Sequence, residues 1–123
     1  MTVRAIIDQA IGMVITPNFV EAEDISDALR RFGFENVIHC RSADQAVDLL
    51  SPDDTPPTIA LMSFHEVDAD AERLLAMLHA AGSLQVLING DASYASDHNA
   101  VFLHRPYSDQ ELDRCIADVM AAG

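Results

Sequence analysis

Lysine is absent from this chain of 123 residues, and so is tryptophan. All seven basic residues are therefore arginines, which excludes reactions that depend on a lysine amine, such as Schiff-base formation. Basic residues are also few beside the 20 acidic ones, so the formal net charge is −13. Because such a charge repels nucleic acid and anionic membrane surfaces, we expect neither as a partner.

Cysteines and long apolar runs are also scarce. Cys40 and Cys115 are the two cysteines, and their wide separation does not match the CxxC spacing of a zinc or redox site. No apolar run approaches the roughly 18 residues of a membrane span, and no signal segment opens the chain. These absences predict a cytoplasmic protein with reduced thiols, and the length predicts a single domain.

Short apolar runs alternate with amphipathic stretches along the chain. This pattern is typical of a parallel sheet covered by helices on both faces, because strands buried on both sides read as continuous apolar runs. We expect strands over residues 13–16, 37–40, 58–63, 84–89 and 100–104. We expect helices over residues 19–32, 43–50, 69–81 and 109–121.

The ends of these helices carry sequence signals. Gly33 follows the first helix, in the position where glycine ends helices. Three helix starts show the spacing of a capping box, in which a short polar side chain is followed three residues later by Glu or Gln. The pairs are Asn18 with Glu21, Ser42 with Gln45, and Ser108 with Glu111.

Two segments depart from a simple repeat of strand and helix. Val3, Ile6, Ile7 and Ala10 are spaced like an extra short helix, so residues 1–11 are expected to form an N-terminal arm or helix. The domain proper would then cover residues 12–123. Between the fourth and fifth strands, residues 90–99 leave too little chain for a full helix, so we expect the fourth helix to be shortened.

The end of the fifth strand carries a resemblance to a known family. The run Phe102-Leu103-His104-Arg105-Pro106-Tyr107, placed before a capped last helix, and Ser63 at a mid-chain strand end resemble the receiver domain of two-component response regulators. The resemblance covers residues 12–121. It implies a flavodoxin-like α/β fold, a three-layer doubly wound sandwich with five parallel strands in the order 2-1-3-4-5. It also implies a cis peptide bond between Arg105 and Pro106.

The family's reactive residues are missing from the matching positions. In active receivers an acidic pair holds Mg²⁺, an Asp accepts the phosphoryl group, and a hydroxyl and a Lys contact it. The resemblance places these roles on Pro17 and Asn18, Ser63, Asn89 and Arg105, respectively. Without carboxylates at the first three positions nothing draws Mg²⁺ from its water shell, and a serine without a base is a poor nucleophile.

The resemblance therefore predicts a degenerate receiver domain that is not phosphorylated on aspartate. It would hold no metal or cofactor, would not be an enzyme, and would act in a two-component or phosphorelay pathway by protein contact. Its partner would be a signalling protein, a histidine kinase or a second copy of the chain. Phe102, His104 and Tyr107, around the end of the last strand, are the candidate interaction surface.

Two other interpretations of the same residues stay open. Asn18, Ser63, Asn89 and Arg105 combine neutral polar groups with one cation, a set that suits an anion or small molecule, or an enzyme site. Arg105 can instead pair with an acid, with Asp91 expected nearby, and so replace the contact of the missing lysine.

Overall fold

Five parallel strands form one sheet in the computed structural model, which describes residues 10–50, 56–64, 68–88 and 100–122. The strands lie in the order β2-β1-β3-β4-β5, as the resemblance to receiver domains implied. Because every pairing is parallel, the carboxyl ends of all five strands lie along the same edge of the sheet. The strands are β1 (Ile11–Ile15), β2 (Asn36–Cys40), β3 (Ile59–Met62), β4 (Leu84–Ile88) and β5 (Val101–Leu103).

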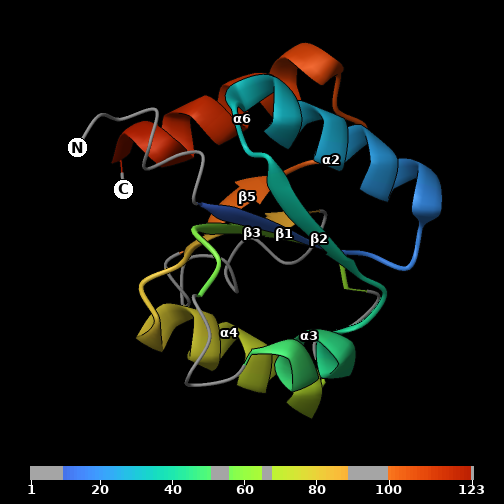
Figure 1. Cartoon of the computed structure of the whole chain (residues 1–123). Helices are drawn as coiled ribbons and strands as arrows, with labels where there is room; N and C mark the ends of the chain where they lie inside the picture. The colour runs from blue at the N-terminus through green and yellow to red at the C-terminus, as the bar shows by residue number, and fades with distance from the viewer. Residues whose placement is uncertain (1–9, 51–55, 65–67, 89–99, 123) are drawn as a thin grey trace.

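Helices cover both faces of the sheet and make three layers, which confirms the predicted architecture (Figure 1). On one face lie α2 (Phe19–Phe32) and α6 (Asp109–Ala122), in contact with each other. On the other face lie α3 (Ala43–Leu49) and α4 (Ala69–Ala80), also in contact. None of these helices, and no other helix of the described residues, is long and apolar enough to cross a membrane.

The strands contribute to two hydrophobic cores because successive side chains point to opposite faces. In β3, Ile59 and Leu61 pack on the side of α2 and α6, whereas Ala60 and Met62 pack on the side of α3 and α4. All four residues are fully buried. Burial on both faces explains why the strand reads as an unbroken apolar run.

Helix α2 has the bounds that the sequence predicted. Its apolar side, which includes Ile25 and Leu29, is buried against the sheet. Gly33 ends the helix with φ of +124°, and its N–H donates to the carbonyl oxygens of Leu29 and Arg30 at 3.1 and 3.0 Å. A φ in this region favours glycine, so the residue both stops α2 and turns the chain toward β2.

Strand β1 begins earlier than the sequence pattern indicated. Ile11, which the pattern placed in the N-terminal arm, pairs with Asn36 of β2. Gly12 interrupts the apolar run, so the hydrophobic pattern alone did not mark the first residues of the strand. Residues 1–9 of the predicted arm and the predicted shortened fourth helix at residues 90–99 lie outside the described residues.

Gly12 allows α2 to approach β1 closely. A Cβ atom at this position would lie 2.9 Å from Cδ1 of Leu29, closer than carbon atoms normally pack. Leu29 is fully buried, so it has little room to move away. The missing side chain at residue 12 therefore lets this helix pack closely against β1.

We expect Gly12→Ala to lower the free energy of unfolding by about 1–2 kcal/mol. Alanine restricts the unfolded chain more than glycine does, which is stabilising, but the overpacking against Leu29 outweighs this gain. Adding Leu29→Ala should partly relieve the clash. The double variant should therefore lose less free energy of unfolding than the sum of the losses in the two single variants. Urea unfolding of the four proteins measures this coupling. Strictly additive effects would show that the two residues do not meet.

Candidate functional site

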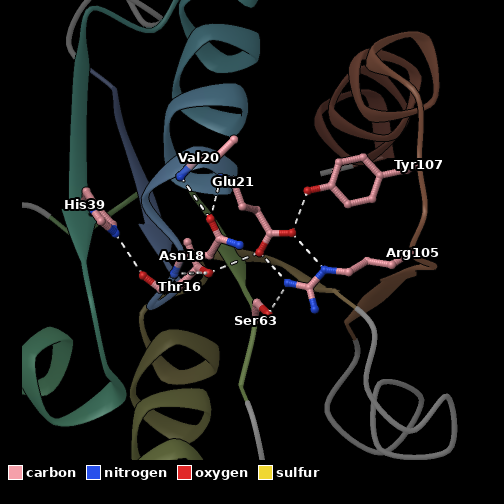
Figure 2. Close-up of polar contacts among 8 residues, drawn as sticks. All are labelled: Thr16, Asn18, Val20, Glu21, His39, Ser63, Arg105 and Tyr107. Carbon is pink, nitrogen blue, oxygen red and sulfur yellow. Dashed lines mark hydrogen bonds and ion pairs between the residues drawn. The ribbon is translucent and has the colours of Figure 1, made fainter.

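Polar side chains gather at the carboxyl ends of β1, β3 and β5. Thr16 follows β1 and Ser63 follows β3, while Arg105 lies two residues beyond β5. Glu21 comes from the first turn of α2, and Tyr107 comes from the segment leading into α6 (Figure 2). Ligand sites of doubly wound sheets form at this edge, so the cluster is the candidate site.

The carboxylate of Glu21 lies at the centre of the cluster (Figure 2). Its Oε2 accepts hydrogen bonds from Nε of Arg105 at 2.8 Å and from the hydroxyl of Tyr107 at 2.9 Å. Its Oε1 accepts one from Nη2 of Arg105 and one from the hydroxyl of Thr16, the latter at 3.1 Å. The carboxylate and the guanidinium thus form a bidentate ion pair, the geometry for which arginine is suited.

Ser63 is held by the same arginine. It is 6% exposed, and its Oγ accepts a hydrogen bond from Nη2 of Arg105 at 2.5 Å. A guanidinium donates but does not accept, so Arg105 cannot serve as a base that would remove the serine proton. Arg105 therefore bridges Glu21 and Ser63 without activating the hydroxyl.

Side chains fix the turn between β1 and α2. The Thr16 hydroxyl oxygen accepts from the backbone N–H of Asn18 at 3.2 Å while it donates to Glu21. Oδ1 of Asn18 caps the helix by accepting from the N–H groups of Val20 and Glu21 at 2.9 and 3.2 Å. From β2, Nε2 of His39 donates to the Thr16 carbonyl at 2.9 Å. Together these contacts direct Glu21 toward the strand ends.

The positions to which the resemblance assigned the acidic pair of receivers offer no free side-chain ligand for a metal ion. Pro17 is exposed and has no side-chain oxygen, and Oδ1 of Asn18 already accepts two helix N–H groups. The Glu21 carboxylate is likewise occupied by donors from Thr16, Arg105 and Tyr107. Over the described ranges, no group of three His, Cys, Asp or Glu side chains is arranged to hold a metal ion. The residues present do not fit the Mg²⁺ of an active receiver.

The electrostatics of the cluster favour the charged ion pair. Burial raises the pKa of Glu21, but hydrogen bonds from Arg105 and Tyr107 and the arginine charge outweigh it, so the pKa falls below its ordinary value of 4.5. The hydrogen bond to Glu21 raises the pKa of Arg105. Burial, followed by the hydrogen bond to Glu21, raises the pKa of Tyr107, which keeps the hydroxyl protonated and able to donate.

The sequence correctly predicted that Arg105 pairs with an acid, although it did not identify Glu21 as that acid. Asp91, the expected neighbour, and Asn89, to which the resemblance assigned the family's hydroxyl, both lie outside the described residues. The peptide bond between Arg105 and Pro106 is cis, as predicted. The one signal that could have indicated Glu21 was its place in the first turn of a helix that starts at the site.

Of the three predicted capping boxes, the one at the start of α6 is complete. Ser108 Oγ accepts from the N–H of Glu111 at 3.1 Å, and the Glu111 carboxylate accepts from the N–H of Ser108 at 3.4 Å. The return bond predicted from Glu21 to Asn18 is wrong, because the ion pair with Arg105 takes that carboxylate. Asn18 still caps α2 from its own side.

The capping box predicted at the start of α3 is also wrong. Ser42 makes no side-chain hydrogen bond to the helix backbone. Its hydroxyl donates instead to the Asp44 carboxylate at 2.5 Å, while the Gln45 side chain accepts from the N–H of Arg41 at 2.8 Å. Local competition between neighbouring polar side chains therefore decided the geometry.

The predicted interaction residues fall on two sides of the sheet. The rings of Phe102 and His104 contact each other edge to face, with centroids 4.4 Å apart. Phe102 is partly buried against the core on the side of α3 and α4, and His104 is exposed. Tyr107 packs against the opposite core and donates to Glu21. Tyr107 thus belongs to the polar cluster, apart from the other two residues.

Comparison with known proteins gives similarity in structure alone. No protein-family model matches the chain, and no curated protein matches it in sequence. Among solved structures, a response regulator receiver protein from Burkholderia phymatum is similar at a TM-score of 0.75 and 18% identity, over 92% of this chain and 96% of that one. One from Sinorhizobium medicae is similar at a TM-score of 0.74 and 14% identity, over 92% and 95%.

A third solved structure is the signal receiver domain of a modulated diguanylate cyclase from Desulfovibrio desulfuricans. It is similar at a TM-score of 0.72 and 21% identity, over 94% of this chain and 96% of that one. The lengths covered are nearly complete in each case, so the likeness extends across the whole domain. The chain has the flavodoxin-like fold of response regulator receiver domains.

We expect Glu21→Gln to lower the free energy of unfolding by about 1–2 kcal/mol near neutral pH, because charged hydrogen bonds are lost from a partly exposed cluster. The loss should shrink as the pH falls. The folded-state pKa of Glu21 lies below its unfolded value, so its stabilisation is complete above about pH 4.5 and disappears as the folded carboxylate is protonated.

Urea unfolding of wild type and variant between about pH 7 and pH 3 measures this difference. Glu23→Gln is the matched control, since Glu23 lies exposed on the same helix and makes none of these contacts. A Glu21 effect no larger than the Glu23 effect, or one that grows on acidification, would contradict the ion pair.

Proposed function

We propose that this chain is a degenerate receiver domain that works by protein contact in two-component or phosphorelay signalling and is not phosphorylated on aspartate. The receiver fold supports the signalling class, and the composition of the candidate site supports the loss of phosphorylation. Folds host many functions, so it is the second observation that supports a degenerate receiver over a working one.

The observation that carries the proposal is the bidentate pair between Glu21 and Arg105, which also engages Ser63. In an active receiver, the phosphoryl group arrives at a carboxylate at the end of the third strand and meets a cation there. Here the residue in that place is a serine, and the cation is already neutralised by a carboxylate of the same chain. Neither an acceptor nor a metal-binding acidic pair is present among these residues.

Protein partners suit the remaining surface. The net charge of −13 disfavours nucleic acid and anionic membranes as partners. At the end of β5, an edge strand, the paired rings of Phe102 and His104 offer aromatic contact area of the kind common in protein interfaces. A signalling protein, a histidine kinase or a second copy of the chain is the proposed partner.

Binding of an anion or small molecule in the same pocket is the alternative function. It has less support, because Arg105, the cation that would bind the anion, is paired with Glu21. An external anion would have to replace that carboxylate. Strong thermal stabilisation of the wild-type protein by nucleotides or phosphate would favour this alternative.

Incubation with acetyl phosphate and Mg²⁺ should leave the intact mass of the protein unchanged. The expected reason is that no base contacts Ser63 among the described residues, and that the acceptor position holds a serine in place of a carboxylate. A receiver with the complete set of acids, treated in parallel, shows that the phosphoryl donor is active. The gain of one phosphoryl group on this chain, mapped to Ser63 or its pocket, would refute the proposal.

His104→Ala should weaken self-association or partner capture while it leaves the melting temperature unchanged, because His104 is exposed beside the partly buried Phe102. Light scattering over a range of concentrations and pull-down with a cognate kinase measure the effect. Arg114→Ala is a control on the exposed side of α6. Equal association of the two variants would argue against this surface.

A further inference from the structure

The donors around the Glu21 carboxylate come from three separate parts of the chain. Thr16 follows β1, Arg105 follows β5, and Tyr107 lies just before α6. We infer that these three side chains form an oxyanion cradle and that Glu21 is its built-in occupant, which keeps external anions out and ties α2 to the segment before α6. The inference rests on the proposed function, because it names what fills the pocket in place of a phosphoryl group.

Each member of the oxyanion cradle is held by a contact that does not involve Glu21. Thr16 is 1% exposed, and its hydroxyl oxygen also accepts from the N–H of Asn18. Arg105 also donates to Ser63 at 2.5 Å. The ring of Tyr107 packs against the core beneath α2 and α6. The donors should therefore keep their positions when the Glu21 carboxylate is removed.

The donor set matches a small oxyanion in charge and geometry. Two nitrogens of one guanidinium and two hydroxyl groups converge on the two oxygens of one carboxylate (Figure 2). Planar guanidinium groups bind carboxylate and phosphate in this two-pronged manner. Without an occupant, the cradle would leave the guanidinium without a counter-charge, and the Thr16 and Tyr107 hydroxyl groups would lose the acceptor that they now share, which is costly in a partly buried place.

Arg105 is the more exposed member of the ion pair. The side chain of Arg105 is 37% exposed, whereas that of Glu21 is 10% exposed. An anion from solvent can therefore reach the guanidinium once Glu21 is shortened. In the wild-type chain the occupant is covalently attached, so its effective concentration exceeds that of any dilute anion.

Chemical rescue of Glu21→Ala tests this inference. The variant should melt at a lower temperature than wild type, and sodium acetate should raise its melting temperature in a saturable manner relative to sodium chloride at equal ionic strength. At about ten times the dissociation constant of acetate, the expected rise is roughly 4–8 °C. Inorganic phosphate at the same ionic strength shows whether the cradle also accepts a tetrahedral anion, and rescue by either anion supports the inference.

Two variants serve as controls. Glu23→Ala, on the exposed side of α2, should show no saturable response to acetate. Adding Arg105→Ala to Glu21→Ala should abolish the rescue, because the main donor is lost. If Glu21→Ala does not fold in chloride, its refolding yield in acetate and in chloride replaces the melting temperature.

The inference is overturned if neither anion stabilises Glu21→Ala more than Glu23→Ala, or if the Arg105 variant is rescued equally well. This readout is independent of phosphorylation, which intact mass reports separately. A chain that is phosphorylated but rescued by acetate would refute the proposed function and keep the cradle. A chain that is neither phosphorylated nor rescued would refute the cradle and keep the proposed function.

Discussion

The bidentate ion pair between Glu21 and Arg105 is the interaction on which the carboxyl edge of the sheet depends. It connects α2 with the segment after β5, two parts of the chain that are 84 residues apart. Burial of a carboxylate is costly, and here the hydrogen bonds from Arg105, Tyr107 and Thr16 offset that cost. The same contacts neutralise the guanidinium that an incoming phosphoryl group would require and occupy the carboxylate that a metal ion would require.

The scaffold and the site have separate physical origins. Strands buried on both faces, with helices packed on each side, need continuous apolar runs and do not depend on which polar side chains follow them. The residues Pro17, Asn18 and Ser63 at the strand ends are therefore compatible with this fold. The chemistry of that edge is decided separately, by an internal carboxylate that pairs with the arginine.

Much of the fold could be predicted because its determinants are local. The alternation of apolar runs gave the strands and helices, and Gly33 marked the end of α2. The strand order came from the resemblance to receivers. The start of β1 was missed because Gly12 broke the apolar run. Ile11 belongs to the strand because it pairs with Asn36 of β2, and this contact between distant residues leaves no local signal in the sequence.

The centre of the site could not be predicted from local patterns. The sequence indicated that Arg105 needs an acid, but many acids were available, and the partner depends on which helix start faces the strand end. Glu21 also fitted a capping box with Asn18, a local alternative that the tertiary ion pair outcompetes. The hydrogen bond from Tyr107 to this carboxylate could not be predicted either, because it too joins distant parts of the chain.

A double-mutant cycle between Glu21→Gln and Arg105→Met tests most directly whether this pair closes the pocket. Unfolding free energies of the four proteins at neutral pH give the coupling between the two side chains. We expect a favourable coupling of about 1–3 kcal/mol, as for contacting residues in one network. A coupling below about 0.3 kcal/mol, the value typical of independent sites, would contradict a pocket closed by its own carboxylate.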